Sequence, residues 1–500
     1  MKIPFLPCFL GWCLCLAATI DQSVLAQTPT PAAPTMISAE AARADLAQLY
    51  QTLQHAHFDL YANRSHSDYE QRYQQLRRKL EQPISAFDLQ IELQKFTAYG
   101  QVAHARIDFP ALEFERYRAA GGSMLPLELK LRDGRIFVVG NPGSESQPQA
   151  GDQILSINGE PAAAWRSRLL AHVSADNDYL ADTLLELRFG ALLWLELGEV
   201  ASVQLDLRSA DGSLSRVSVA TLDRAQMRLA AEKRSPSLAL NWSKREARML
   251  DRGLAYLRPG PFYNDDPEAA SVWDSRGFSD FVERSFAQFA EANANSLLID
   301  LRDNPGGDNS FSDLIVRRIA DKPFRFCSQF RIKISEATTA SNAARLAQGF
   351  SEVSAQFAEL YAGQQPGEVV NFELPWVQPA PPEERFSGQV YVLINRYSYS
   401  NAVTVAAMSQ DYGFATILGE ETADLASTYG AMEQFTLKNS GLVVGYPKAH
   451  IIRPNGDPSR RGVVPDIAIE TPLLEGAEDP VVQKAVDVIG ELSVQDRLED

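Results

Sequence analysis

The sequence is poor in cysteine, and the cysteines that it has lie almost all at its beginning. Cys8, Cys13 and Cys15 fall within the first apolar run, and Cys327 is the only cysteine after it. A chain from which that run has been removed cannot form an internal disulfide, so its stability has to come from packed cores. Cys327 lies in the strand-like stretch Phe324–Cys327, which favours a small buried residue over a nucleophile.

Blocks of positive charge and long hydrophobic runs are also missing. The chain has 47 Lys and Arg against 64 Asp and Glu, a net charge of −17, and no long basic block. This balance argues against nucleic acid as a partner. No segment after the first residues is apolar enough to cross a bilayer, so we expect no permanent membrane span.

The N-terminus carries an export signal. Lys2 precedes an apolar run from Ile3 to Ile20, and Val24-Leu25-Ala26 places small residues where a signal peptidase cleaves. Cysteine, glycine and proline interrupt the run, which favours a cleaved signal over an uncleaved anchor. We therefore expect a mature chain that begins at Gln27 and is periplasmic or secreted.

The remaining chain divides by composition and periodicity. Leu46, Leu49 and Leu53 recur at helical spacing, whereas short strands with Asp133-Gly134 and Asn158-Gly159 turns dominate from about residue 125. Beyond residue 250, apolar strands alternate with helices, which predicts an α/β domain. The predicted parts are a signal (1–26), a linker (27–36), a helical domain (37–122), a β domain (123–222), a charged connector (223–250), an α/β core (251–475) and a C-terminal helix (476–500).

Within the α/β part, two strand ends have the layout of a hydrolytic site. The strand Leu297–Leu301 runs into Pro305-Gly306-Gly307, where backbone N–H groups can face a ligand without side-chain obstruction. The strand Val390–Ile394 runs into a polar turn and then a helix that starts near Ser400. Taken singly, the first is equally an ordinary strand–helix turn and the second an N-cap serine.

Four motifs together indicate a family. DLRDNPGG (300–307), YSYSNAVTVAAMSQDYG (397–413), ILGEET (417–422) and RGVVPDI (461–467) occur in the order and spacing typical of tail-specific (carboxyl-terminal processing) serine proteases, and the chain resembles their tricorn-core-like branch. GDQILSINGEP (151–161) resembles part of a PDZ domain. The resemblance implies a crotonase/ClpP-like α/β protease core with an N-terminal helical domain and an inserted PDZ-like β domain. It further implies that the substrate is a protein or peptide and that no metal or cofactor takes part.

The resemblance also assigns the site. Aligned on Gln410–Gly413, the nucleophile is Ser400 rather than Ser398, and the oxyanion donors are the N–H of Asn401 and the Gly306-Gly307 turn. The lysine base of the bacterial processing enzymes would stand at Leu425, so a Ser–Lys dyad is not expected.

The tricorn-like branch uses a histidine instead, and His104 occupies its place. His450 is the second candidate, and an incidental surface histidine is the alternative for His104. The acid that orients the base would be Asp457, the only carboxylate shortly before the GVVPD segment. The alternative function is a non-catalytic peptide- or ligand-binding protein on the same fold.

Overall fold

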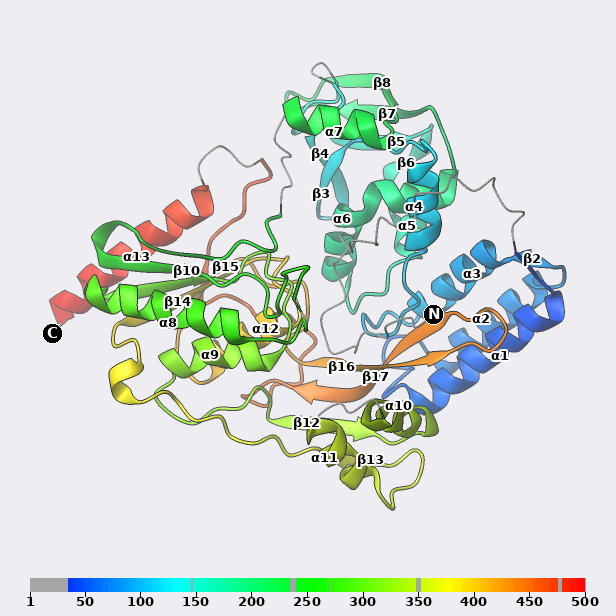
Figure 1. Ribbon diagram of the computed structural model, residues 1–500. Helices are drawn as coiled ribbons and strands as arrows, with labels where there is room; N and C mark the ends of the chain where they lie inside the picture. Colours follow the sequence, from blue (N-terminus) through cyan, green and yellow to red (C-terminus); the bar gives the residue numbers. More distant parts are fainter. Residues whose placement is uncertain are drawn as a thin grey trace.

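The computed structural model describes residues 35–144, 147–233, 240–269, 271–347, 352–474 and 479–499. The predicted signal and most of the predicted linker lie outside these residues. Figure 1 shows a mixed α/β molecule in which an N-terminal helical group, a β unit and a larger α/β core meet. No helix within the described ranges has the length and hydrophobicity that a bilayer span requires.

The N-terminal group is helical, as the periodicity predicts. Ser38 and Ser85 cap two of its helices by accepting the N–H groups of Ala41 and Asp88. The buried face packs onto Val444 and Tyr446 of the core. Its elements are β1 (Met36–Ile37), α1 (Ala39–Ala56), α2 (His66–Lys79), β2 (Ile84–Ser85), α3 (Ala86–Ala98) and α4 (Ala111–Ala119).

The β unit is an antiparallel sheet with two helices packed against it. Its strand order is β3-β4-β5-β7-β8, with β6 paired to β5. The short strands predicted around the Asp133-Gly134 and Asn158-Gly159 turns are present, and helix α5 follows the second of these turns. The elements are β3 (Glu128–Arg132), β4 (Arg135–Gly140), β5 (Gln153–Ile157), β6 (Glu160–Pro161), α5 (Ala162–Leu170), α6 (Asp178–Leu197), β7 (Ser202–Arg208) and β8 (Leu214–Ala220).

The segment expected as a charged connector is partly structured, which corrects that prediction. It contains α7 (Arg224–Lys233) and β9 (Glu246–Met249), and β9 pairs with β10 as the antiparallel edge of the core sheet. The core therefore begins at β9, before residue 251. The sequence does not predict β9 as a strand, because its charged residues interrupt the apolar pattern. An edge strand has one exposed side and does not need a continuous apolar run.

The core sheet is parallel except for β9 and has helices on both faces. Its order is β18-β15-β14-β11-β10-β9. Its other strands are β10 (Leu254–Arg258), β11 (Ser296–Asp300), β14 (Gln389–Ile394), β15 (Thr416–Gly419) and β18 (Ile467–Ala468). The helices are α8 (Arg276–Glu291), α9 (Asn309–Ile319), α12 (Asn401–Asp411) and α13 (Pro480–Glu499).

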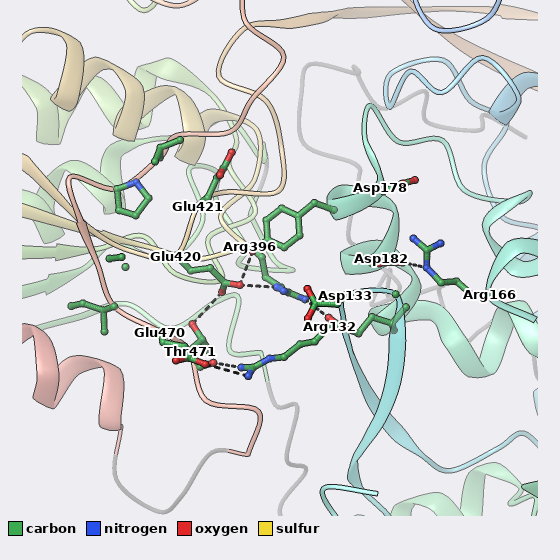
Figure 2. A pocket seen from close by; sticks show the side chains of 18 residues that line it. Arg132, Asp133, Arg166, Asp178, Asp182, Arg396, Glu420, Glu421, Glu470 and Thr471 are labelled. Atoms are coloured by element: carbon green, nitrogen blue, oxygen red, sulfur yellow. Dashed lines mark hydrogen bonds and ion pairs between the residues drawn. The ribbon is translucent and has the colours of Figure 1, made fainter. Parts of the chain in front are cut away.

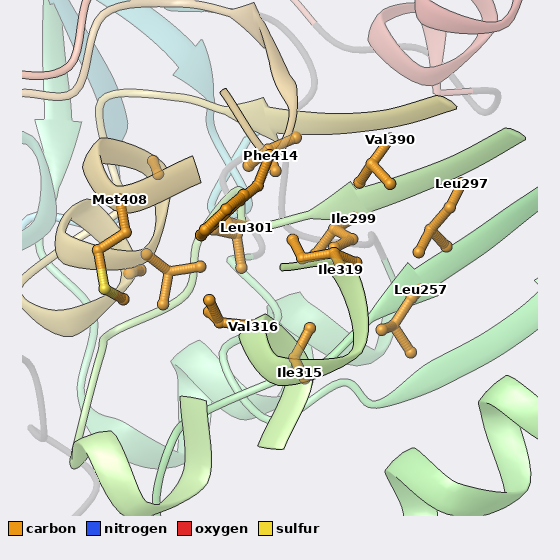
Figure 3. Close-up of a cluster of buried hydrophobic side chains, with 14 of the residues drawn as sticks. Leu257, Leu297, Ile299, Leu301, Ile315, Val316, Ile319, Val390, Met408 and Phe414 are labelled. Atoms are coloured by element: carbon orange, nitrogen blue, oxygen red, sulfur yellow. The ribbon is translucent and has the colours of Figure 1, made fainter. Parts of the chain in front are cut away.

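Successive strand residues point to opposite faces and enter different cores. Leu297 and Ile299 join the cluster under α8, α9 and α12, which Figure 3 shows around Val316 and Met408. Leu298 between them enters the cluster covered by α13. Burial on both faces explains why these strands are continuously apolar in sequence.

A second, antiparallel sheet connects the core to the N-terminal helices. Its order is β13-β12-β17-β16, and β16 and β17 form the long hairpin that reaches the helical group in Figure 1. The residue pattern does not predict this hairpin. The remaining elements are β12 (Gln329–Lys333), α10 (Glu336–Ala347), α11 (Glu352–Tyr361), β13 (Val369–Asn371), β16 (Thr428–Thr436) and β17 (Val443–Ile452).

Candidate active site

Ser400 lies at a sharp turn between β14 and α12. Its backbone has φ +53° and ψ −120°, a conformation that non-glycine residues rarely adopt and that recurs at functional sites. Although Ser400 is at the N-cap position, its side chain makes no capping hydrogen bond to the helix. The N-cap explanation of this serine is therefore not supported by the geometry.

Ser398, the neighbouring candidate, has a structural role. Its side chain is fully buried, its Oγ donates to the Leu301 carbonyl at 2.8 Å, and it accepts the Asn395 N–H at 3.1 Å. The Asn395 side chain in turn accepts the N–H groups of Tyr397 and Ser398. These bonds hold the turn together before the chain reaches Ser400.

The Gly306-Gly307 turn lies directly against Ser400. A Cβ atom added at Gly306 would lie 2.6 Å from the Tyr399 carbonyl oxygen, 2.7 Å from the Asn401 nitrogen and 2.9 Å from the Ser400 Cβ. No side chain fits there. The structure thus brings together Gly306, Gly307, Ser400 and Asn401, four of the residues that the sequence singled out.

The backbone N–H groups around Ser400 differ in whether they already have a hydrogen-bond partner. The Gly306 N–H is taken by the Asn304 side chain at 2.8 Å. The N–H groups of Gly307 and Asn401, by contrast, have no hydrogen-bond partner within the described ranges. Two N–H groups left without partners beside a nucleophile are what an oxyanion hole requires.

A buried carboxylate that is not among the predicted site residues fixes the nucleophile turn. Asp424 Oδ2 accepts the Ser400 N–H at 2.7 Å, and Oδ1 accepts the Leu425 N–H at 3.0 Å. Burial raises the pKa of Asp424 to about 6, and these two bonds oppose the rise. The available signal was its position, since Asp424 directly precedes Leu425, where the lysine of other family members would stand.

His104 is buried in the loop between α3 and α4. Burial and the nearby Arg106 charge lower the pKa of its imidazole to about 4, and a backbone contact with Tyr429 partly offsets this. Its Nδ1 atom has no hydrogen-bond partner within the part of the chain that the structure describes. The preceding residue, Ala103, belongs to the same apolar cluster as Tyr399 and Ala423, which flank Ser400 and Asp424.

Asp176 is a second buried carboxylate near these groups. It lies between α5 and α6 and is 7% exposed. Burial, followed by the Asp424 charge, raises its pKa to about 7. Neither of its carboxylate oxygens has a hydrogen-bond partner within the described residues, although the Ala103 backbone N–H and the Arg460 guanidinium face it.

Asp457, the predicted orienting acid, lies on the surface. Its carboxylate accepts the N–H and hydroxyl of Ser459, at 2.9 Å and 2.8 Å. Its partners are therefore in its own turn, and among the described residues no contact with His104 is found. The turn-forming sequence Asn-Gly-Asp-Pro-Ser explains this local use of the side chain.

The alternative bases make other contacts. His450 packs its ring against Tyr429 and Phe58. Lys448 is buried and pairs with Glu433 at 2.6 Å. The described residues contain no cluster of three or more His, Cys, Asp or Glu side chains that could hold a metal ion.

A pocket of about 880 Å³ separates the β unit from the core and is shown in Figure 2. The guanidinium group of Arg396 extends into it. Its Nε donates to Glu420 at 3.0 Å, and its Nη1 donates to Glu186 of α6 at 2.8 Å. Glu186 also accepts the hydroxyl of Tyr397 at 2.5 Å. The nucleophile turn is therefore tied to the β unit through Arg396 and Tyr397.

Comparison with known proteins places this site in a family. Residues 270–469 match the model of peptidase family S41, a stretch that contains the glycine turn and Ser400 but not His104. No curated protein sequence matches the chain. Mature CPAF complexed with lactacystin has a TM-score of 0.59 and 18% identity, over 92% of this chain and 99% of CPAF. A second structure of mature CPAF has a TM-score of 0.57 and 18% identity, over 86% of this chain and 92% of CPAF.

These likenesses show a shared fold. Residues 270–469 thus form a peptidase family S41 domain, and the chain that carries it is a serine peptidase.

Proposed function

We propose that the chain is an exported endopeptidase that hydrolyses peptide bonds of protein or peptide substrates through Ser400. The observation that carries this proposal is the strained backbone of Ser400, seated against a glycine turn that only glycine can form. Strain of this kind persists only where the surrounding structure imposes it, and here three hydrogen-bonded groups do so: Asn395, Ser398 and Asp424.

In the proposed reaction, Ser400 Oγ attacks the scissile carbonyl carbon and its proton passes to a ring nitrogen of His104. The lowered pKa keeps this imidazole neutral, and therefore able to accept a proton, at pH 7. The N–H groups of Asn401 and Gly307 stabilise the oxyanion. Gly306 contributes space rather than a donor, because its own N–H is held by Asn304.

The finer parts of the architecture belong to the same proposal. We assign the β unit, residues 123–222, as PDZ-like, and the parallel sheet with its helices as a crotonase/ClpP-like core. Support comes from the antiparallel sheet closed by α5 and α6, and from the parallel strands whose carboxyl ends carry the site. At the edge of the β unit, Glu186 and Arg396 bond the Leu131 N–H and carbonyl. We therefore expect weak binding of peptides by strand addition at this point.

Export is proposed from the N-terminal run of the sequence. Cleavage after Ala26 would give a periplasmic or secreted protein that begins at Gln27. N-terminal sequencing of protein from the native host tests this directly. A chain that starts at Met1 would replace the cleaved signal with an uncleaved anchor.

Proteolysis is tested with an unfolded protein substrate such as fluorescently labelled, denatured casein. Wild-type protein should release fluorescent peptides, and Ser400→Ala should not, with both proteins melting at the same temperature. Lactacystin, with which mature CPAF has been crystallised, serves as a second probe and should slow the release. A folded wild-type protein that cleaves no substrate and takes up no serine-directed probe would instead support the binding protein.

A further inference from the structure

The site contains one buried carboxylate, Asp176, whose oxygens accept no hydrogen bond within the described residues and whose nearest cation, Arg460, is 3.9 Å away. Both oxygens of Asp176 are inaccessible and lack a hydrogen bond within the described residues. An unpaired buried carboxylate costs several kcal/mol, and each such group in a folded protein calls for an explanation. Hydrogen bonding within the fold does not explain Asp176.

The surroundings of Asp176 connect it to both halves of the catalytic pair. On one side Ser174 Oγ donates to the Ala105 carbonyl at 2.7 Å, which holds the segment of Asp176 against that of His104, and the Asp176 carboxylate faces the backbone N–H of Ala103. On the other, Asn177 Nδ2 donates to the Ala423 carbonyl at 3.4 Å, next to Asp424, whose Oδ2 accepts the Ser400 N–H. Arg460 lies in the loop between β17 and β18, and its Nη2 atom is 3.9 Å from Asp176 Oδ1.

His104 also has a buried polar atom without a hydrogen bond. Its Nδ1 is also buried and without a partner in the part of the chain that the structure describes. After taking a proton from Ser400, the ring becomes a cation in a dry site, where it requires an anion nearby. Asp457, the acid expected from the sequence, is exposed and bonded within its own turn.

We propose that Asp176 is the positioning carboxylate of this site, which orients His104 and stabilises the imidazolium formed when Ser400 attacks. This inference rests on the proposed function. The proton moves from Ser400 Oγ to His104 and later to the leaving amine, and it does not pass on to Asp176. The acid thus comes from the segment before α6, not from the loop before β18.

The test is the rate at which a fluorophosphonate probe labels Ser400 in the full-length chain. Asp176→Asn should lower the second-order labelling rate by about 10²- to 10⁴-fold, because the amide holds the imidazole in the wrong tautomer. Its melting temperature should stay equal or rise, since the substitution removes a buried, unpaired charge. The matched control is Asp182→Asn on α6, whose carboxylate pairs with Arg166 at 2.6 Å and should leave the labelling rate unchanged.

The pH profile separates positioning from a structural role. The charged and titratable groups around the pair are Arg106 of the same loop, Tyr429 of β16, Asp424 after β15 and Arg460 before β18. Loss of the carboxylate should shift the acid limb of the labelling rate to lower pH, because the imidazolium loses its anion. A structural role would not move this limb.

The double variant His104→Ala/Asp176→Asn should label no more slowly than His104→Ala alone, because the two residues act as one unit. Wild-type protein that does not label at all would refute the proposed function itself. Wild-type protein that labels, with Asp176→Asn labelling equally fast per folded molecule, would overturn only the role of Asp176. Additive losses in the double variant would overturn it as well.

Discussion

At the scale of single residues, the nucleophile depends on a carboxylate that holds its backbone. Asp424 accepts the N–H groups of Ser400 and Leu425 from a buried position. Asp424→Ala should leave both donors unsatisfied, at a cost of about 1–3 kcal/mol each in the free energy of unfolding. We expect kcat to fall at least about tenfold, because a shift of about 1 Å at the nucleophile is costly. Asp424→Asn, which keeps one acceptor oxygen, should lie between alanine and wild type. Wild-type kcat for Asp424→Ala would contradict this.

The base is the second prediction at this scale. His104→Ala should lower kcat by about 10²-fold or more with a smaller change in KM, as loss of a general base does. Because burial lowers the imidazole pKa to about 4, the part of the acid limb of kcat/KM that is due to His104 should lie below pH 6.5. Lys438→Ala, on the β16–β17 turn, is the matched control and should leave kcat unchanged. A limb between pH 7 and 8, with His104→Ala near wild type, would point to a lysine base.

At the scale of elements, the site depends on the close approach of two strand-to-helix turns. Gly306→Ala would push a methyl group into the backbone of residues 399–401, and activity should be abolished. Gly413→Ala is the matched control, because Gly413 also has positive φ (+73°, against +83°) but no atom lies within 4 Å of its added Cβ. In both variants the left-handed backbone lowers the free energy of unfolding by about 1 kcal/mol. Only Gly306→Ala should lose turnover of labelled casein, and equal loss in both would show that backbone strain alone is responsible.

The same elements show what a sequence can predict and why. The strands β10, β11 and β14 and the turns after them were predictable, because burial on both faces leaves continuous apolar runs that end in glycine or polar residues. The β16–β17 hairpin was not, because one of its faces packs on helices that are distant in sequence. Asp424 and Asp176 were missed for a related reason. Their importance comes from burial beside Ser400 and His104, which only the tertiary structure creates.

At the scale of the whole molecule, the buried carboxylates should make stability depend on pH. The pKa of Asp176 is raised to about 7 and that of Asp424 to about 6, from 3.8 in both cases. Between about pH 4 and pH 7 the native state therefore binds more protons than the unfolded state, and these groups destabilise the fold as pH rises. Asp176→Asn should thus gain about 1–3 kcal/mol over wild type at pH 8, and less at pH 5. Urea unfolding of both proteins at the two pH values measures this, and an equal difference at both would contradict it.

Covalent labelling shows directly whether Ser400 is the nucleophile. Wild-type protein is treated with a fluorophosphonate, digested, and the adduct is mapped by mass spectrometry. We expect one adduct, on Ser400, that is absent from Ser400→Ala. Ser398 should remain unmodified, because its hydroxyl is buried and bonded to Leu301. An adduct on another serine, or none in a preparation that cleaves casein, would contradict the account.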